Sequence, residues 1–116
     1  MVSKLFVENP LPKTKKLIIN VKFYESLTSI LGYGIEKFGA KVTYDFYKKV
    51  MDSINKLPTM PDIHPKSRFI ESTIKKTYRN ILIEKYAVLY AVTAQTIQVI
   101  TIYHQFINPN KIKSYL

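Results

Sequence analysis

The spacing of apolar residues changes along the chain, and this change constrains the fold more than any other feature. The run from Lys16 to Lys22 has the composition and length of a β-strand. Apolar residues then recur at helical spacing from Leu27 to Phe38 and again from Val42 to Leu57. Gly39 falls between the two stripes as a helix stop. Because the connection is so short, we expect an antiparallel helical hairpin.

Glycine and proline mark the places where these elements should weaken or end. Gly32 and Gly34 each disfavour a helix by roughly 1 kcal/mol, so the first helix is expected to bend or fray there. Pro58 ends the second helix. It also opens a proline-rich segment, 58–68, which we expect to be a structured loop.

Three strand-like runs complete the pattern, over 73–83, 86–93 and 96–104. Glu84-Lys85 and Ala94-Gln95 are candidate two-residue turns between them. The order β-α-α-β-β-β predicts an α+β domain in which the helical hairpin packs on one face of a mostly antiparallel sheet. The other face is expected to stay open.

The ends of the chain lack this periodicity. Residues 1–15 contain two prolines and are expected to form an extended or disordered N-terminal arm. The folded domain would then span 16–107. Residues 108–116 would form a C-terminal tail, either a short helix or a free end.

Hairpin pairing around the expected turns assigns side chains to the two faces of the sheet. One face would carry mostly tyrosines and an arginine: Arg79, Tyr86, Val88, Tyr90, Thr101 and Tyr103. The other would carry small and aliphatic residues: Leu82, Ala87, Leu89, Ala91, Ile100 and Ile102. We expect the aliphatic set to lie under the helices, which would leave the tyrosine set on the open face.

The charge balance indicates the class of partner. Sixteen lysines and two arginines oppose eight acidic residues, giving a net charge of +10. Such an excess favours a nucleic acid, an acidic protein segment, or both. The alternative is a lysine-rich surface that only keeps the protein soluble. The sequence contains no cysteine, no apolar run long enough for a bilayer and no apparent secretory signal, so we expect a cytoplasmic protein.

Arg79 and His104 are the candidate catalytic residues. Arginine can grip a phosphate with two parallel hydrogen bonds, and histidine can transfer a proton near neutral pH. The alternatives are a salt bridge from Arg79 to Glu71 or Glu84, and a structural role for His104. Strict alternation places the two side chains on opposite faces, so a β-bulge would be needed to bring them together.

Several other residues are candidates for binding a nucleic acid or a target protein. Basic side chains can contact phosphates, and tyrosines can stack on bases, although tyrosines are also common in strands for structural reasons. The candidates are Lys66, Arg68, Lys75, Lys76, Tyr86 and Tyr90. The sequence contains no glycine-rich phosphate loop and no metal-ligand motif, so we expect no cofactor and no metal.

The strand motifs resemble those of the RelE/ParE superfamily of type II toxins. The resemblance covers about residues 16–107 and is most specific in three strand segments. These are Tyr78-Arg79-Asn80-Ile81-Leu82-Ile83, Tyr86-Ala87-Val88-Leu89-Tyr90 and Ile100-Thr101-Ile102-Tyr103-His104. Phe38-Gly39 between the helices and Leu57-Pro58 after them also fit. The resemblance implies a bacterial toxin that is held inactive by a cognate antitoxin, as a hetero-oligomer.

The superfamily contains two activities, and this sequence departs from the pattern of each. RelE-like members cut mRNA in the ribosomal A site without a metal, and ParE-like members inhibit DNA gyrase. Arg79 matches the sheet arginine of YoeB-like nucleases, His104 falls near their histidine, and Lys75-Lys76 are loose counterparts of the RelE lysines. The tyrosine that often follows that histidine is replaced here by Gln105-Phe106. The acidic base has only approximate counterparts in Asp62 and Glu71, and the arginines that follow the histidine in ParE-like members are missing.

Three hypotheses follow from the resemblance. The first is a ParE-like inhibitor of DNA gyrase, towards which we lean. The second is a RelE-like ribosome-dependent endoribonuclease, in which Arg79 and His104 act at the phosphate. The third is a decayed toxin that retains only antitoxin binding. Whether the chain is an enzyme stays open at this point.

Overall fold

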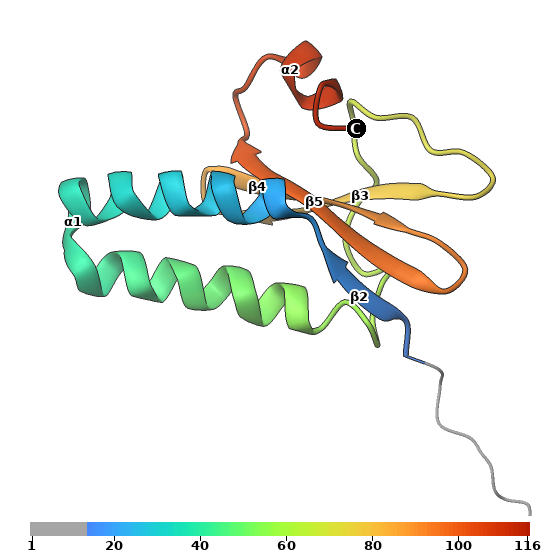
Figure 1. Ribbon diagram of the computed structural model, residues 1–116, viewed down its shortest axis with the longest axis horizontal. Helices are drawn as coiled ribbons and strands as arrows, with labels where there is room; N and C mark the ends of the chain where they lie inside the picture. Colours follow the sequence, from blue (N-terminus) through green and yellow to red (C-terminus); the bar gives the residue numbers. More distant parts are fainter. Residues whose placement is uncertain (1–13) are drawn as a thin grey trace, which may run out of the picture.

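The computed structural model describes residues 14–116, so most of the proposed arm, 1–13, lies outside the described residues. Figure 1 shows a sheet with a long helical hairpin on one side and a short C-terminal helix on the other. The elements follow the expected order: β2 (Lys16–Ile19), α1 (Val21–Asn55), β3 (Thr77–Ile83), β4 (Tyr86–Val92), β5 (Thr96–His104) and α2 (Pro109–Lys113). Within the described part of the chain, no helix is long and apolar enough to cross a membrane.

The first strand is shorter than the sequence indicated, because Asn20 caps the helix that follows. Its side chain accepts a hydrogen bond from the Lys22 amide at 2.8 Å, which satisfies one of the free donors at a helix start. Its own amide donates to the Val99 carbonyl at 2.8 Å. Asn20 therefore ends the strand at Ile19 and directs the chain into α1.

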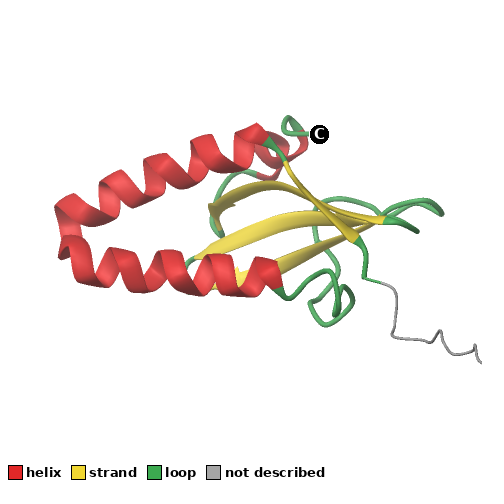
Figure 2. Ribbon diagram, turned by 60° about the horizontal axis from the view of Figure 1, so that its bottom comes forward, coloured by secondary structure: helices red, strands yellow, loops and turns green. Residues whose placement is uncertain are grey.

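The helical hairpin is confirmed, and its turn is formed by a single residue. Gly39 has φ 85° and ψ 169°, a backbone conformation that side-chain-bearing residues rarely adopt, and it divides α1 into two antiparallel arms (Figure 2). The helix shows no break at Gly32 or Gly34, so the expected bend or fraying there is wrong. A Cβ at position 34 would lie 2.8 Å from Thr43 Oγ1, so Gly34 allows the arms to approach closely.

The sheet has the strand order β2-β5-β4-β3, in which β2 runs parallel to β5 and the other pairs are antiparallel. The pairing of Arg79 with Tyr90 and of Ile83 with Tyr86 confirms the turn at Glu84-Lys85. Glu84 itself takes a left-handed conformation with φ 53°. The Gln105 side chain donates to the carbonyls of Glu84 and Tyr86, which helps to fix the turn.

A β-bulge in β5 changes the expected faces. Leu89 pairs with Thr101 but Tyr90 pairs with Val99, so Ile100 is the extra residue. The expected pairing of Thr101 with Val88 is therefore wrong. Ile102 and His104 instead lie opposite Val88 and Tyr86, on the same face as those residues.

The helices cover the face that we expected to be open. Phe23, Phe46 and Ile54 of α1 form one apolar core with Val88 and Tyr90 of β4. The sequence-based assignment of the faces is wrong here, since Tyr86, Val88 and Tyr90 lie under the helices. Large side chains fill the roughly 10 Å between two packed layers, which alanines cannot do.

The second face of the sheet is not open either. It carries Ala87 and Ala91, whose small side chains allow other segments to approach. Ile70 from the long loop and Ile112 from α2 pack there, and Ile112 is fully buried. The tail is thus a short helix docked on the sheet, and the expectation of an uncovered face is wrong.

Candidate functional site

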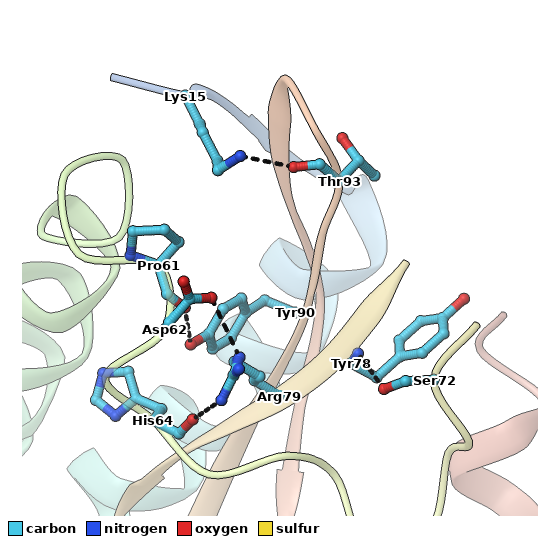
Figure 3. Close-up of polar contacts among 9 residues, drawn as sticks. All are labelled: Lys15, Pro61, Asp62, His64, Ser72, Tyr78, Arg79, Tyr90 and Thr93. Atoms are coloured by element: carbon cyan, nitrogen blue, oxygen red, sulfur yellow. Dashed lines mark hydrogen bonds and ion pairs between the residues drawn. The ribbon is translucent and has the colours of Figure 1, made fainter. Parts of the chain in front are cut away.

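Arg79 belongs to a polar cluster that joins the proline-rich loop to the sheet (Figure 3). Its Nη1 donates to the His64 carbonyl at 2.7 Å, and its Nε lies 3.6 Å from Asp62 Oδ1. The Arg79 side chain is only 16% exposed. Its acidic partner is Asp62, so the alternatives Glu71 and Glu84 are wrong. A guanidinium held in this way presents little of its fork to an incoming phosphate.

Tyr90 completes this cluster from the neighbouring strand. It lies opposite Arg79, is fully buried, and donates its hydroxyl to the Pro61 carbonyl at 2.9 Å. Burial raises the pKa of Tyr90 to about 12; Arg79 opposes this shift and Asp62 adds to it. Tyr90 cannot stack on a base from this position, so its proposed exposure on an open binding face is wrong.

His64 takes part in the same cluster, although its sequence context gave no reason to select it. Its ring packs edge-on against Tyr90 with the centroids 6.2 Å apart. Burial, and secondarily the charge of Arg79, lower the pKa of His64. Its carbonyl is the acceptor for Arg79. The cluster therefore has the features of a structural junction between loop and sheet.

His104 lies at the other end of the same sheet face. The β-bulge places it beside Tyr86, with the ring centroids 5.4 Å apart, and its Nδ1 accepts a hydrogen bond from the Phe106 amide. Tyr86 and Tyr90 mark the two ends, and they lie four positions apart on β4, which corresponds to about 13 Å of strand. Buried Val88 lies between them. The bulge brings Arg79 and His104 to one face, but it does not bring them into one site.

A cavity of about 430 Å³ lies on the second face of the sheet, and we call it the second-face cavity. Lys66 and Arg68 from the loop line it, together with Asn80 of β3 and Tyr103 of β5. Asn80 is 7% exposed and Tyr103 is 4% exposed. Asn80 Oδ1 and the Tyr103 hydroxyl have almost no exposed surface. The two side chains are neighbours, because a hydrogen bond with Asn80 contributes to the pKa of Tyr103.

Tyr103 is a residue of this cavity whose pKa is shifted. Burial raises the pKa of the Tyr103 hydroxyl, and a hydrogen bond with the Asn80 side chain partly offsets this effect. The hydroxyl therefore stays protonated near neutral pH and can donate a hydrogen bond. Among residues 14–116, no acidic residue and no histidine lines the cavity. The cavity can bind an anion, but it lacks a side chain suited to proton transfer near neutral pH.

The remaining candidate residues lie in separate places. Lys75 and Lys76 line an open groove of about 690 Å³ at the β4–β5 turn. Tyr86 lines a hollow of about 520 Å³ between the sheet and the hairpin tip, opposite Tyr33 and Phe38. The six binding candidates therefore do not form one surface. Lys66 and Arg68 share a cavity with buried Asn80 and Tyr103, and Tyr86 shares a smaller one with buried Thr43.

Asn80 and Tyr103 were not among the site residues expected from the sequence. A polar residue between Arg79 and Ile81 in a strand was a signal that could have indicated Asn80. Tyr103 was assigned to the face of Arg79, because a regular strand would place it there. The bulge moves it to the opposite face. Within residues 14–116, no group of three or more histidine and acidic side chains could hold a metal ion.

Comparison with solved structures identifies the fold. One similar chain belongs to the chromosomal ParDE TA system from P. aeruginosa, with a TM-score of 0.63 and 13% identity over 78% of this chain and 96% of that one. Another belongs to the archaeal RelE–RelB complex from Pyrococcus horikoshii OT3, with a TM-score of 0.52 and 16% identity over 82% and 99%. No protein-family profile and no curated protein sequence matches this chain. The chain thus has the RelE/ParE-like α+β fold, as its strand motifs indicated.

Proposed function

We propose that this protein is the toxin of a type II toxin–antitoxin module and acts as ParE-like toxins do, by binding DNA gyrase. The observation that carries this proposal is the position of Arg79. It is tied to Asp62 and the His64 carbonyl, and it is separated from His104 by the buried core. A nuclease that used this pair would need both groups at one phosphate. Inhibition by binding requires no such arrangement.

The exposed part of the helical hairpin supports binding to a protein target. Phe38 and Val42 belong to the apolar stripes of the two arms, yet they are 63% and 56% exposed because the hairpin tip extends beyond the sheet (Figure 2). Tyr33, Ile35 and Tyr44 are exposed beside them. A cluster of exposed aromatic and aliphatic side chains is typical of a protein interaction surface. The overhanging hairpin would contact gyrase or the antitoxin.

The likeness to chains of ParDE and RelE–RelB structures supports an antitoxin as the partner. A toxin with a charge of +10 would be neutralised by an antitoxin whose binding segment is acidic and folds on docking. The two proteins would form a hetero-oligomer in the cytoplasm. Expression of the toxin alone would stop growth, and co-expression with the antitoxin would restore it.

A ribosome-dependent endoribonuclease is the second candidate, and the second-face cavity favours it. Lys66 and Arg68 could hold an RNA phosphate there. In the part of the chain that the structure describes, no histidine or acidic residue lines the cavity for proton transfer. That absence is why we place this function second. In this candidate the chemistry would use basic residues and no metal.

One induction experiment separates these functions. The chain is expressed in bacteria from a repressed promoter, with a matched transcript in which Val2 is replaced by a stop codon. We expect induction of the SOS response and double-strand breaks in DNA, with mRNA left intact. Cleavage of translated mRNA at codons would instead show the RelE-like activity. Neither effect, together with a stable antitoxin complex, would indicate a decayed toxin.

A further inference from the structure

The hairpin tip and the β3–β4 turn border a hollow at one end of the sheet. Tyr33 and Phe38 line it from α1, and Tyr86 and His104 line it from the sheet. Its outer part has a volume of about 520 Å³, and an inner part of about 70 Å³ continues between the two helical arms. We call the two parts together the tip hollow. A volume of this size is typical of sites that bind small molecules.

Aromatic rings line the tip hollow from both the helix and the sheet. Tyr33 and Phe38 are 53% and 63% exposed, although both belong to a helix that packs on the sheet. Across the hollow, the Tyr86 ring contacts both Phe46 and His104, with the ring centroids 5.3 and 5.4 Å apart. Packing therefore fixes the rings on the sheet side, whereas the rings of α1 leave surface free for a ligand. A planar aromatic ring would fit between these two sides.

The charges around the tip hollow favour an anion over a cation. Glu84 is the acidic residue that lines it, and its carboxylate is paired with Lys49 at 3.0 Å. Lys85 also lines the hollow and has no ion pair within residues 14–116. The Lys37 ammonium lies 6.0 Å from the centre of the Tyr33 ring, where it would repel a bound cation. The local charge is thus positive, as is that of the whole chain.

His104 supplies the tip hollow with a hydrogen-bond donor. Its Nδ1 accepts a hydrogen bond from the Phe106 amide at 3.2 Å, so the proton of the neutral ring lies on Nε2. Within the described residues, His104 uses only Nδ1 in a hydrogen bond, which leaves the Nε2–H group for a ligand. The Gln105 amide donates to the Lys85 carbonyl at 2.8 Å and keeps Lys85 near His104. One anionic group could therefore accept from both side chains.

We infer that the tip hollow binds a small planar aromatic molecule that carries an anionic group, either a phosphate or a carboxylate. The aromatic ring of the ligand packs against Tyr33 and Phe38, opposite Tyr86. Its anionic group accepts hydrogen bonds from the Lys85 ammonium and from His104 Nε2. Nucleotides and aromatic acids both have this chemistry. The inference goes beyond the proposed function, because this binding requires neither gyrase nor an antitoxin.

The test measures ligand binding to the full-length protein made by cell-free synthesis, which avoids toxicity. Backbone amide signals are followed by NMR during titration with adenosine monophosphate and, separately, with indole-3-acetate. The first ligand offers a phosphate and the second a carboxylate, so the tighter one identifies the anionic group. We expect at least one Kd below about 1 mM, with the signals of Tyr33, Lys85 and Tyr86 shifting most. If neither ligand shifts these signals, the inference is wrong.

Three comparison probes separate the features of the ligand. Adenosine keeps the aromatic ring without the anionic group, and inorganic phosphate keeps the anion without a ring. Each should bind at least about 10-fold more weakly than the tighter aromatic anion, because each lacks one of the two kinds of contact. Choline carries the opposite charge and tests the alternative of a cation site. Adenosine, phosphate or choline binding as tightly as the aromatic anions would overturn the inference.

Two matched pairs of variants locate the site. Tyr33→Ala and Tyr44→Ala each remove one exposed tyrosine of the hairpin, but Tyr44 lies outside the tip hollow. The first should weaken binding about 5-fold or more and the second less than about twofold. Lys85→Gln should weaken binding about 3–10-fold. Lys113→Gln removes the same charge from α2 and should change binding less than about twofold.

A fifth variant tests the hydrogen bond from His104. His104→Phe keeps an aromatic ring beside Tyr86 but removes the donor, so it should weaken binding about 2–10-fold. All five substituted side chains are exposed, so the variants should fold. Equal losses within either matched pair would overturn the inference, because they would indicate attraction to overall charge or to exposed rings in general.

Discussion

Arg79 and Tyr90 lie opposite each other on β3 and β4, and both side chains bind the backbone of the same loop. Arg79 donates to the His64 carbonyl at 2.7 Å, and Tyr90 donates to the Pro61 carbonyl at 2.9 Å. Two hydrogen bonds from adjacent strands thus fix this loop, in addition to its backbone pairing with β3. The loop continues to Lys66 and Arg68 at the second-face cavity. The junction therefore supports the cavity from the opposite side of the sheet.

The first prediction concerns the contribution of Arg79 to stability. Arg79→Ala should lower the free energy of unfolding by about 1–3 kcal/mol, because it leaves the His64 carbonyl without its donor. Asp62→Ala, the matched change at its exposed partner, should cost less than about 1 kcal/mol. Urea denaturation followed by circular dichroism measures both. Equal stability of Arg79→Ala and the wild type would show that Arg79 is free for another role.

The second prediction concerns alkaline pH and Tyr90. Its pKa is raised to about 12 in the folded protein, above the usual value of 10.0. Its contribution to stability is therefore complete below pH 10 and is lost as the pH rises towards 12, because the unfolded chain releases this proton first. Tyr90→Phe should lower stability at pH 8 by about 0.5–1.5 kcal/mol. The difference between the two proteins should shrink between pH 10 and 12 in thermal denaturation.

The comparison with the phenylalanine variant is needed because lysines also titrate in this range. Tyr103→Phe provides a second reference, since burial raises the pKa of Tyr103 as well. A stability difference between wild type and Tyr90→Phe that stays constant up to pH 12 would contradict the prediction.

The third prediction compares two glycines in one helical arm. Gly32→Ala should stabilise the protein by about 0.5–1 kcal/mol, since a Cβ there meets nothing within 4 Å. Gly34→Ala should instead destabilise it by about 1–3 kcal/mol, because the new Cβ would lie 2.8 Å from Thr43 Oγ1 and push the arms apart. Chemical denaturation gives both values. Thr43→Ala should largely rescue the Gly34→Ala protein, and the absence of rescue would argue against the contact.

The fourth prediction concerns His104 in growth inhibition. Its ring packs beside Tyr86, at the opposite end of the sheet face from Arg79. Its Nδ1 accepts a hydrogen bond from the Phe106 amide. His104→Gln should leave growth inhibition nearly unchanged, because binding to gyrase requires no proton transfer. Colony counts after induction measure this, with protein levels checked by immunoblot. A loss of codon-specific mRNA cleavage in His104→Gln, at normal stability, would support the nuclease instead.

Local sequence signals were sufficient for the order of the elements and for much of the pairing. The apolar spacing identified both helical arms, and Gly39 marked the turn between them. The Glu84-Lys85 turn gave the register of β3 with β4, including Arg79 opposite Tyr90. These features depend on neighbours in the chain, so periodicity and turn length could predict them. Asn20 could also have been recognised, as asparagine is a common helix cap.

The position of the candidate site depended on the tertiary structure. The bulge at Ile100 has no local signature, yet it turns Tyr103 to the second face and His104 to the first. Which face the helices cover was decided by volume, because Tyr90 and Val88 fill the space beneath them, whereas Ala87 and Ala91 admit the loop and α2. The sequence by itself determined the elements, the positive charge and the hairpin. Tertiary packing decided which side chains contact one another, because packing depends on residues that are far apart in the chain.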